Sequence, residues 1–408
     1  MKKYFLIYLF NLVLISCLFS QTENNYSIHL EGTYGTILKH TKHLNNLVKG
    51  PVVGGELSVE WQTMGEKDWH QYLGFPDIGL GAVVLNLGND KMLGNLFALY
   101  PYLNFKLLRT NFIHVNLKAG AGASFLTKTF DNTATNPMDL NTGNAAIGSK
   151  LNVYFAGGLN FTIPIDYGFA LVADMQWNHA SNGSFYQPNS GINMLNASVG
   201  IAYAPYYKHS YTPRLRTRPR LNQYPAIELI AAGGVRELYY KDDKQYPTGS
   251  FVVAVYKPLG NAFRLGLGVE SFYDGVYNGK TEFKRTYLNE DKLANKIRVG
   301  LALRPELVFG RFSAGIHFGM YVYNPLKNLE PYNDASVAQL DKPLIYKYNV
   351  EEEDGWFYTR AALQYSMTDN LFLSLGLKTH LHKAEFIEWG IGYRFQTRKA
   401  EMPVIRTR

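Results

Sequence analysis

The chain has 408 residues, enough for one large domain or two medium ones, and a formal net charge of +8 at pH 7. Only 18% of the residues are charged, whereas 14% are aromatic and 37 are glycine. A low charge fraction with abundant tyrosine, phenylalanine and glycine is typical of membrane β-barrels. The basic residues form no periodic face, so no nucleic-acid partner is expected. Two explanations of the excess of basic over acidic residues stay open: scattered surface charge, or attraction to anionic lipid headgroups.

The N-terminus has the pattern of an export signal. Two lysines precede an apolar run over residues 4–19, and Ser20 before Gln21 offers a cleavage site. We therefore predict a signal peptide at 1–20 and exclude it from the fold. Cleavage there removes Cys17, the only cysteine, and excludes disulfides and cysteine metal sites. Lipidation of Cys17 within LISC is the alternative.

The rest of the chain alternates between apolar and polar residues with a period of two. In the segment 113–125, Ile113, Leu117 and Phe125 share one face, and Asn116 and Lys118 share the other. No segment after the signal has 18 consecutive apolar residues, so no spanning helix is expected. Repeated strands of about ten residues with one apolar face are typical of outer-membrane barrels. A soluble β-sandwich also alternates, but it would carry more charge.

The predicted strands fall into two groups. We count about eight between Tyr26 and Tyr203 and about eight between Ala226 and Phe395, separated by a basic, proline-rich stretch. The expected fold is all-β, an antiparallel outer-membrane β-barrel of about 16 strands in two eight-strand halves. Inward glycines and the long linker favour two small barrels over one 16-strand ring. The expected boundaries are 22–205 for an acyl-hydrolase half, 206–224 for the linker, 225–397 for the second half and 398–408 for a tail.

Polar residues gather at one corner of a predicted hairpin. The strand FALVADMQWNHAS places Leu171 and Trp177 on its apolar face, and the same alternation puts His179 and Ser181 there. Asn193 shares the apolar parity of the returning strand. Unpaired polar groups facing hydrocarbon cost several kcal/mol each, so their presence requires a reason. Proximity of the interfacial aromatic girdle is one explanation.

A nucleophilic site is the other explanation. Histidine and serine two residues apart on a strand lie on one face, about 7 Å apart along the backbone. His179 would take the proton of Ser181 as general base, and Asn193 would orient the imidazole. The H-x-S-N-G segment that begins at His179 and the P-N segment after it contain amide groups that can donate to an oxyanion. We expect the oxyanion hole to be formed by Asn182, Gly183 and Asn189.

The segment from His179-Ala-Ser-Asn-Gly through Pro188-Asn-Ser-Gly-Ile resembles the lipid A 3-O-deacylases, also known as acyloxyacyl hydrolases. The resemblance covers about the first half of the chain. It implies an eight-strand outer-membrane barrel that removes an ester-linked acyl chain from lipid A at the outer leaflet. We expect this hydrolysis to need no cofactor, and the barrel itself indicates the envelope of a Gram-negative bacterium. The resemblance also implies His179 as base, Ser181 as nucleophile, and Asn182 and Asn189 as oxyanion or support residues. The family usually has a glutamate where this chain has Asn193.

Outer-membrane phospholipase A is similar in the same H-x-S-N-G segment. It has an asparagine fourteen residues after the histidine, which corresponds to Asn193. Its calcium site uses an arginine five residues after the histidine, and Ser184 occupies that place here, which puts calcium in doubt. The PN-S-GI segment follows the deacylase pattern, so lipid A ranks first and phospholipid second. A non-catalytic porin-like or structural barrel with a relict site is the third hypothesis.

Two further groups of polar residues resemble metal sites. His380 and His382, with Glu385 nearby, have the spacing of a zinc pair, but the alternation turns both histidines inward. A polar cluster inside the barrel is the preferred interpretation. The acidic run 351–355 is most simply a solvated loop. We therefore expect no metal.

Overall fold

The computed structural model describes residues 25–41, 44–131, 143–204, 224–238, 244–277, 292–327, 342–348, 355–380 and 383–396. The predicted signal at 1–20 with Cys17, the predicted tail at 398–408 and all but the last residue of the predicted linker lie outside these residues. So do His382 and the acidic run apart from Gly355. No helix in the described part of the chain is long and apolar enough to cross a membrane.

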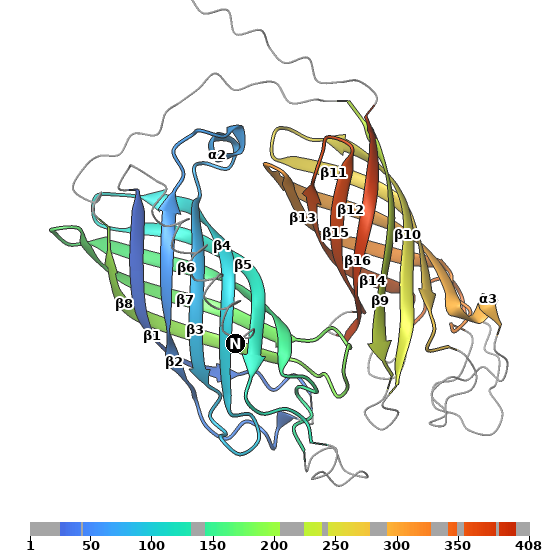
Figure 1. The fold of residues 1–408 in the computed structure, drawn as a ribbon, viewed down its shortest axis with the longest axis horizontal. Helices are drawn as coiled ribbons and strands as arrows, with labels where there is room; N and C mark the ends of the chain where they lie inside the picture. Colours follow the sequence, from blue (N-terminus) through green and yellow to red (C-terminus); the bar gives the residue numbers. More distant parts are fainter. Residues whose placement is uncertain are drawn as a thin grey trace, which may run out of the picture.

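Eight antiparallel strands form a first closed barrel, in which β1 pairs with both β2 and β8 (Figure 1). A short helix, α2 (Asp68–Tyr72), follows the second strand. The strands are β1 (Tyr26–Ile37), β2 (Val52–Gln62), β3 (Asp77–Asn86), β4 (Asn95–Arg109), β5 (His114–Leu126), β6 (Leu151–Pro164), β7 (Phe169–Ser181) and β8 (Ile192–Tyr203).

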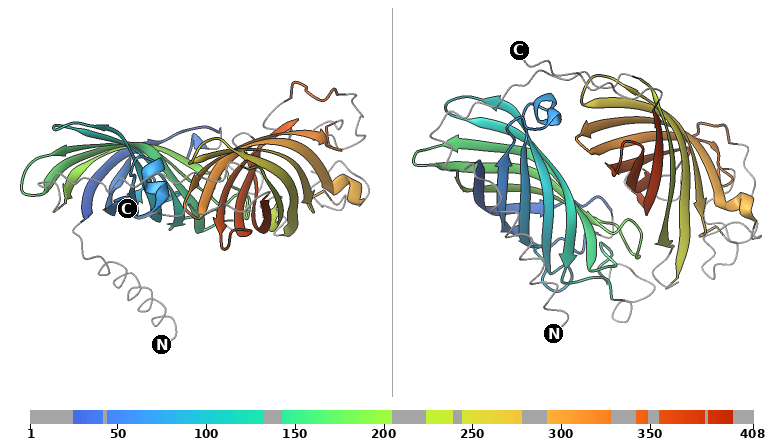
Figure 2. Two further views of the ribbon diagram at one scale, coloured as in Figure 1. Left: turned by 90° about the horizontal axis from the view of Figure 1, so that it is seen from above. Right: turned by 45° about the horizontal axis from the view of Figure 1, so that its top comes forward.

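The second half closes on itself in the same way, through pairing of β9 with β16 (Figure 2). The expected pair of eight-strand barrels is therefore confirmed, and the single ring is not formed. The elements are β9 (Ala226–Glu237), β10 (Gln245–Pro258), β11 (Phe263–Asp274), α3 (Leu293–Lys296), β12 (Ile297–Phe309), β13 (Phe312–Tyr323), β14 (Phe357–Ser366), β15 (Leu371–His380) and β16 (Lys383–Gln396).

The outside of each barrel is apolar and the inside is polar. In β7, Leu171 and Trp177 are exposed on the outer face, whereas Asp174 and Gln176 are buried inside. In β5, Leu117 and Phe125 are likewise exposed, as their alternation predicted. An outward apolar belt around a closed antiparallel barrel is the arrangement that suits hydrocarbon.

Charged and aromatic side chains fill the two interiors. In the first barrel, the Nζ atom of Lys118 lies 2.8 Å from Glu56 and 3.3 Å from Asp174. In the second, Arg264 pairs with Glu228 at 2.6 Å and with Glu306. Buried charges of this kind require partners, and the two signs are interleaved around each lumen. Packed interiors of this kind are unlike the water-filled channels of porins.

His380, one histidine of the candidate zinc pair, belongs to this interior. His380 is buried, and its Nδ1 atom lies 2.9 Å from the carbonyl oxygen of Phe357. Glu385 pairs instead with Lys378 and, at 3.0 Å, with Arg298. Among the described residues, no three potential ligands gather in the way that a metal ion needs.

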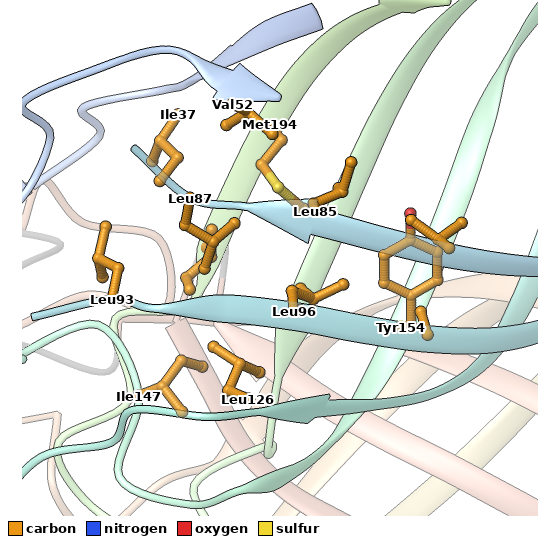
Figure 3. Packing of buried hydrophobic residues seen from close by; sticks show 14 of the residues in the cluster. Ile37, Val52, Leu85, Leu87, Leu93, Leu96, Leu126, Ile147, Tyr154 and Met194 are labelled. Carbon is orange, nitrogen blue, oxygen red and sulfur yellow. The ribbon is translucent and has the colours of Figure 1, made fainter. Parts of the chain in front are cut away.

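The first barrel has long connections at one end and mostly short ones at the other. The connections at the first end are 38–51, 87–94, 127–150 and 182–191, and those at the other end are 63–76, 110–113 and 165–168. An apolar cluster closes the lumen beneath the first end, and several of its members, including Ile37, Leu87, Leu93, Ile147 and Met194, appear in Figure 3. The predicted site lies at this end, because β7 finishes there.

Candidate active site

A continuous hydrogen-bonded chain joins the three residues predicted for catalysis. His179 and Asn193 are directly opposite in the pairing of β7 with β8, and Nδ1 of His179 lies 2.7 Å from Oδ1 of Asn193. Ser181 follows two residues later on the same face, with Oγ 2.8 Å from Nε2 of the imidazole. The amide oxygen only accepts, so the ring donates from Nδ1 and its Nε2 accepts from the serine hydroxyl. This is the tautomer in which histidine serves as a general base.

Aromatic rings fix the imidazole from two sides. Trp177 stacks on His179 with centroids 5.7 Å apart and an interplanar angle of 12°, and Phe155 lies 6.2 Å away. Trp177 is 43% exposed on the outer face, but Ser181 is only 4% exposed. The strand register thus turns the serine outward as predicted, whereas protein groups rather than open hydrocarbon surround its hydroxyl.

His40 extends the chain by one residue that the sequence did not suggest. Its Nε2 lies 2.9 Å from the carbonyl oxygen of Ser190, and its Nδ1 lies 3.2 Å from the amide nitrogen of Asn193. The same Nδ1 atom also lies 3.1 Å from the carbonyl oxygen of Leu38, so it has both a possible acceptor and the Asn193 donor beside it. His40 follows β1, which becomes a neighbour of β8 only when the barrel closes. His40 and Asn193 are 153 residues apart in the sequence, so no local pattern indicated that they would be in contact.

The loop between β7 and β8 places the predicted oxyanion residues differently. The backbone N–H of Asn182 donates to Oδ1 of Asn189 at 3.2 Å, and the Asn182 side chain donates to Ser149 at 2.9 Å. The Nδ2 group of Asn189 is buried without a protein partner. Gly183 has a positive φ of 61° and lies against Ile387 of the second barrel. Among the three, Asn189 is therefore the residue whose side-chain NH2 group is buried with no protein acceptor, whereas Asn182 uses one of its two side-chain N–H donors on Ser149.

Replacement of Gly191 by alanine is expected to lower kcat by about 10- to 100-fold, because small displacements at a reacting centre have effects of this size. A Cβ atom at Gly191 would lie 2.9 Å from Cε1 of His179, and its φ of 75° adds backbone strain. Steady-state kinetics would measure the change. Gly260→Ala is the matched control, since its φ is 98° but nothing lies within 4 Å of the new Cβ. Equal losses in both variants would contradict the steric explanation.

Two family models match the chain. The model of lipid A 3-O-deacylases matches residues 53–202, and the model of the acyloxyacyl hydrolase C-terminal domain matches residues 225–334 and 344–397. The chain belongs to the acyloxyacyl hydrolase family. The expected membership is confirmed, and the protein is an ester-hydrolysing enzyme, as predicted. The C-terminal model matches the second barrel, whose role the sequence left open.

Solved structures show similar barrels. The outer membrane enzyme PagL is 16% identical, with 42% of this chain and 97% of that chain covered and a TM-score of 0.29. A mutant porin of Rh. blastica is 10% identical, with 91% and 99% covered and a TM-score of 0.18. Likenesses this distant carry no argument about function. None of the curated proteins matches the chain.

Proposed function

We propose that this enzyme is an outer-membrane serine esterase that removes an ester-linked fatty acyl chain from lipid A in a Gram-negative envelope. The observation that supports it is the hydrogen-bonded chain from Ser181 through His179 to Asn193 on the outer wall of the barrel. Long loops of such barrels lie on the extracellular side. The site then faces the outer leaflet, where lipid A resides.

The proposed reaction has two steps. His179 takes the proton of Ser181 at Nε2 while Oγ attacks the acyl carbonyl carbon, and the buried Nδ2 group of Asn189 donates to the oxyanion. The tetrahedral intermediate collapses, the imidazolium protonates the leaving alcohol, and an acyl-serine remains. Water then attacks this ester with His179 as base again, and the fatty acid leaves. Neither step requires a metal or a cofactor.

Replacement of Asn193 by glutamate is expected to leave kcat unchanged or to raise it. In the wild type, Nδ1 of His179 lies 2.7 Å from the amide oxygen of Asn193. A carboxylate also accepts a hydrogen bond from Nδ1, and its negative charge stabilises the imidazolium better than an amide does. Asn193→Ala removes the acceptor and should lower kcat by about 10²-fold or more. Steady-state kinetics of both variants would check this. A large loss in Asn193→Glu would show that the site depends on the amide, including its contact with His40.

Phospholipid is the second candidate substrate. An asparagine as the third member of the chain favours it, because outer-membrane phospholipase A resembles this sequence at that place. Against a calcium-dependent mechanism, Ser184 donates its hydroxyl to the carbonyl oxygen of Ala384 at 2.6 Å. The Ser184 hydroxyl is therefore hydrogen-bonded to the second barrel, at the position where the phospholipase has its calcium-site arginine.

Fatty-acid release from lipid A and from phospholipid vesicles would decide between the candidates. Mass spectrometry of wild type and Ser181→Ala, with and without a calcium chelator, gives the comparison. Loss of one ester-linked chain from lipid A, dependent on Ser181 and indifferent to chelator, is the expected result. Phospholipid cleavage that stops with chelator would favour the phospholipase. No Ser181-dependent release from either would contradict the proposed function.

A further inference from the structure

The second barrel contacts the loop that follows the catalytic serine. The backbone N–H of Gln187 donates to a carboxylate oxygen of Glu237 at 2.5 Å, and the backbone N–H of Glu237 donates to the carbonyl oxygen of Ser184 at 2.9 Å. Gln245 donates to the carbonyl oxygen of Phe185 at 3.2 Å. These contacts come from the ends of β9 and β10, and the loop is seen reaching toward the second barrel in Figure 1.

The loop also fits the second barrel sterically. A Cβ atom at Gly183 would lie 2.4 Å from the Ile387 side chain and 3.3 Å from Leu377. Only glycine fits this approach and its positive φ. On the other side, the hydroxyl of Ser184 donates to Ala384 at the start of β16. The segment 183–187 is thus held by residues of β9, β10, β15 and β16.

One residue of this segment connects the second barrel to the oxyanion donor. The side-chain oxygen of Gln187 accepts a hydrogen bond from the backbone N–H of Asn189 at 3.1 Å, while its own N–H is bound by Glu237. Glu237 is 5% exposed, so water competes little for this charged acceptor. A rigid route of two hydrogen bonds therefore leads from β9 to Asn189.

We propose that the second barrel positions the catalytic loop, with Glu237 as the residue that sets the place of Asn189 through Gln187. This role rests on the proposed function, because it assigns Asn189 to the oxyanion. It also gives a reason for a second barrel beside a complete eight-strand hydrolase barrel. The first barrel supplies the nucleophile and base, and the second holds the loop that stabilises the transition state.

The test compares variants of the full-length protein in hydrolysis of a p-nitrophenyl ester, with kcat given per site labelled by a phosphonate probe. Glu237→Ala is expected to lower kcat by about 10- to 100-fold with KM changed less than about threefold, since only transition-state contacts are lost. Glu237→Gln keeps an acceptor oxygen and should recover most of kcat. Gln187→Ala should lower kcat by a similar factor. The kcat of the double variant Gln187→Ala with Glu237→Ala should be little lower than that of either single variant, as expected for two residues that act through the same hydrogen-bonded route.

Glu228 provides the control at the opposite end of β9. It is fully buried and pairs with Arg264 and Arg394, at 2.6 and 2.7 Å, far from the loop. Glu228→Ala should lower the melting temperature and leave kcat per labelled site unchanged. Unchanged kcat in Glu237→Ala, or equal losses in Glu237→Ala and Glu228→Ala, would overturn the positioning role. Absence of Ser181-dependent turnover in the wild type would instead refute the proposed function, and the positioning role with it.

Discussion

Ser181→Ala is expected to lower kcat for acyl-ester hydrolysis by at least about 10⁴-fold, the scale on which serine hydrolases lose activity without their nucleophile. The hydroxyl oxygen lies 2.8 Å from the base, and Asn193 holds that base in the accepting tautomer. His179→Ala should cause a loss of the same order, because the two residues act as a unit in the proposed mechanism. Fatty-acid release followed by mass spectrometry would measure both variants.

The folding control for these variants is heat-modifiable migration in gel electrophoresis together with thermal unfolding. Neither substitution touches the ion pairs inside the barrel, such as Lys118 with Glu56, so both variants should keep the closed barrel. A folded Ser181→Ala protein that retained wild-type activity would rule out the serine mechanism.

Asn189→Ala is expected to lower kcat by about 10²- to 10³-fold, as does removal of one side-chain donor from an oxyanion hole. Its Nδ2 group is the buried donor without a protein partner, and its Oδ1 accepts from Asn182. Steady-state kinetics on a p-nitrophenyl ester would measure the loss, and KM should change little because the contact forms in the transition state.

Asn189→Asp separates catalysis from loop structure. In the wild type the Asn182 N–H lies 3.2 Å from Oδ1 of Asn189, and a carboxylate at this position still offers an oxygen to accept that hydrogen bond. The carboxylate has no N–H donor, however, and it repels an oxyanion. Its kcat should therefore fall at least as far as that of Asn189→Ala while the loop stays in place. If Asn189→Asp were nearly as active as the wild type, Asn189 would not be the oxyanion donor, and another group would have to fill that role.

The alternation of side chains was sufficient to predict much of this protein. Because a strand has a period of two, Leu117, Lys118 and Leu171 could be assigned to the outer or inner face from the sequence alone. The same count placed His179, Ser181 and Asn193 on one face of a hairpin, and the hydrogen bonds among them follow that register. Local contacts of this kind depend on neighbouring residues or on one tight strand pair.

Contacts between distant segments were decided only by the tertiary structure. Closure of the first barrel brings His40 to Asn193, although β1 and β8 lie at opposite ends of the half. Alternation is the same for one ring or two. The inward glycines and the long linker favoured two rings, but the strand pairs that close each ring are known only from the structure. The approach of Glu237 to Gln187 and of Ile387 to Gly183 depends on how the second barrel meets the first. Alternation fixes the face on which a residue lies, but not its partner in another strand or barrel.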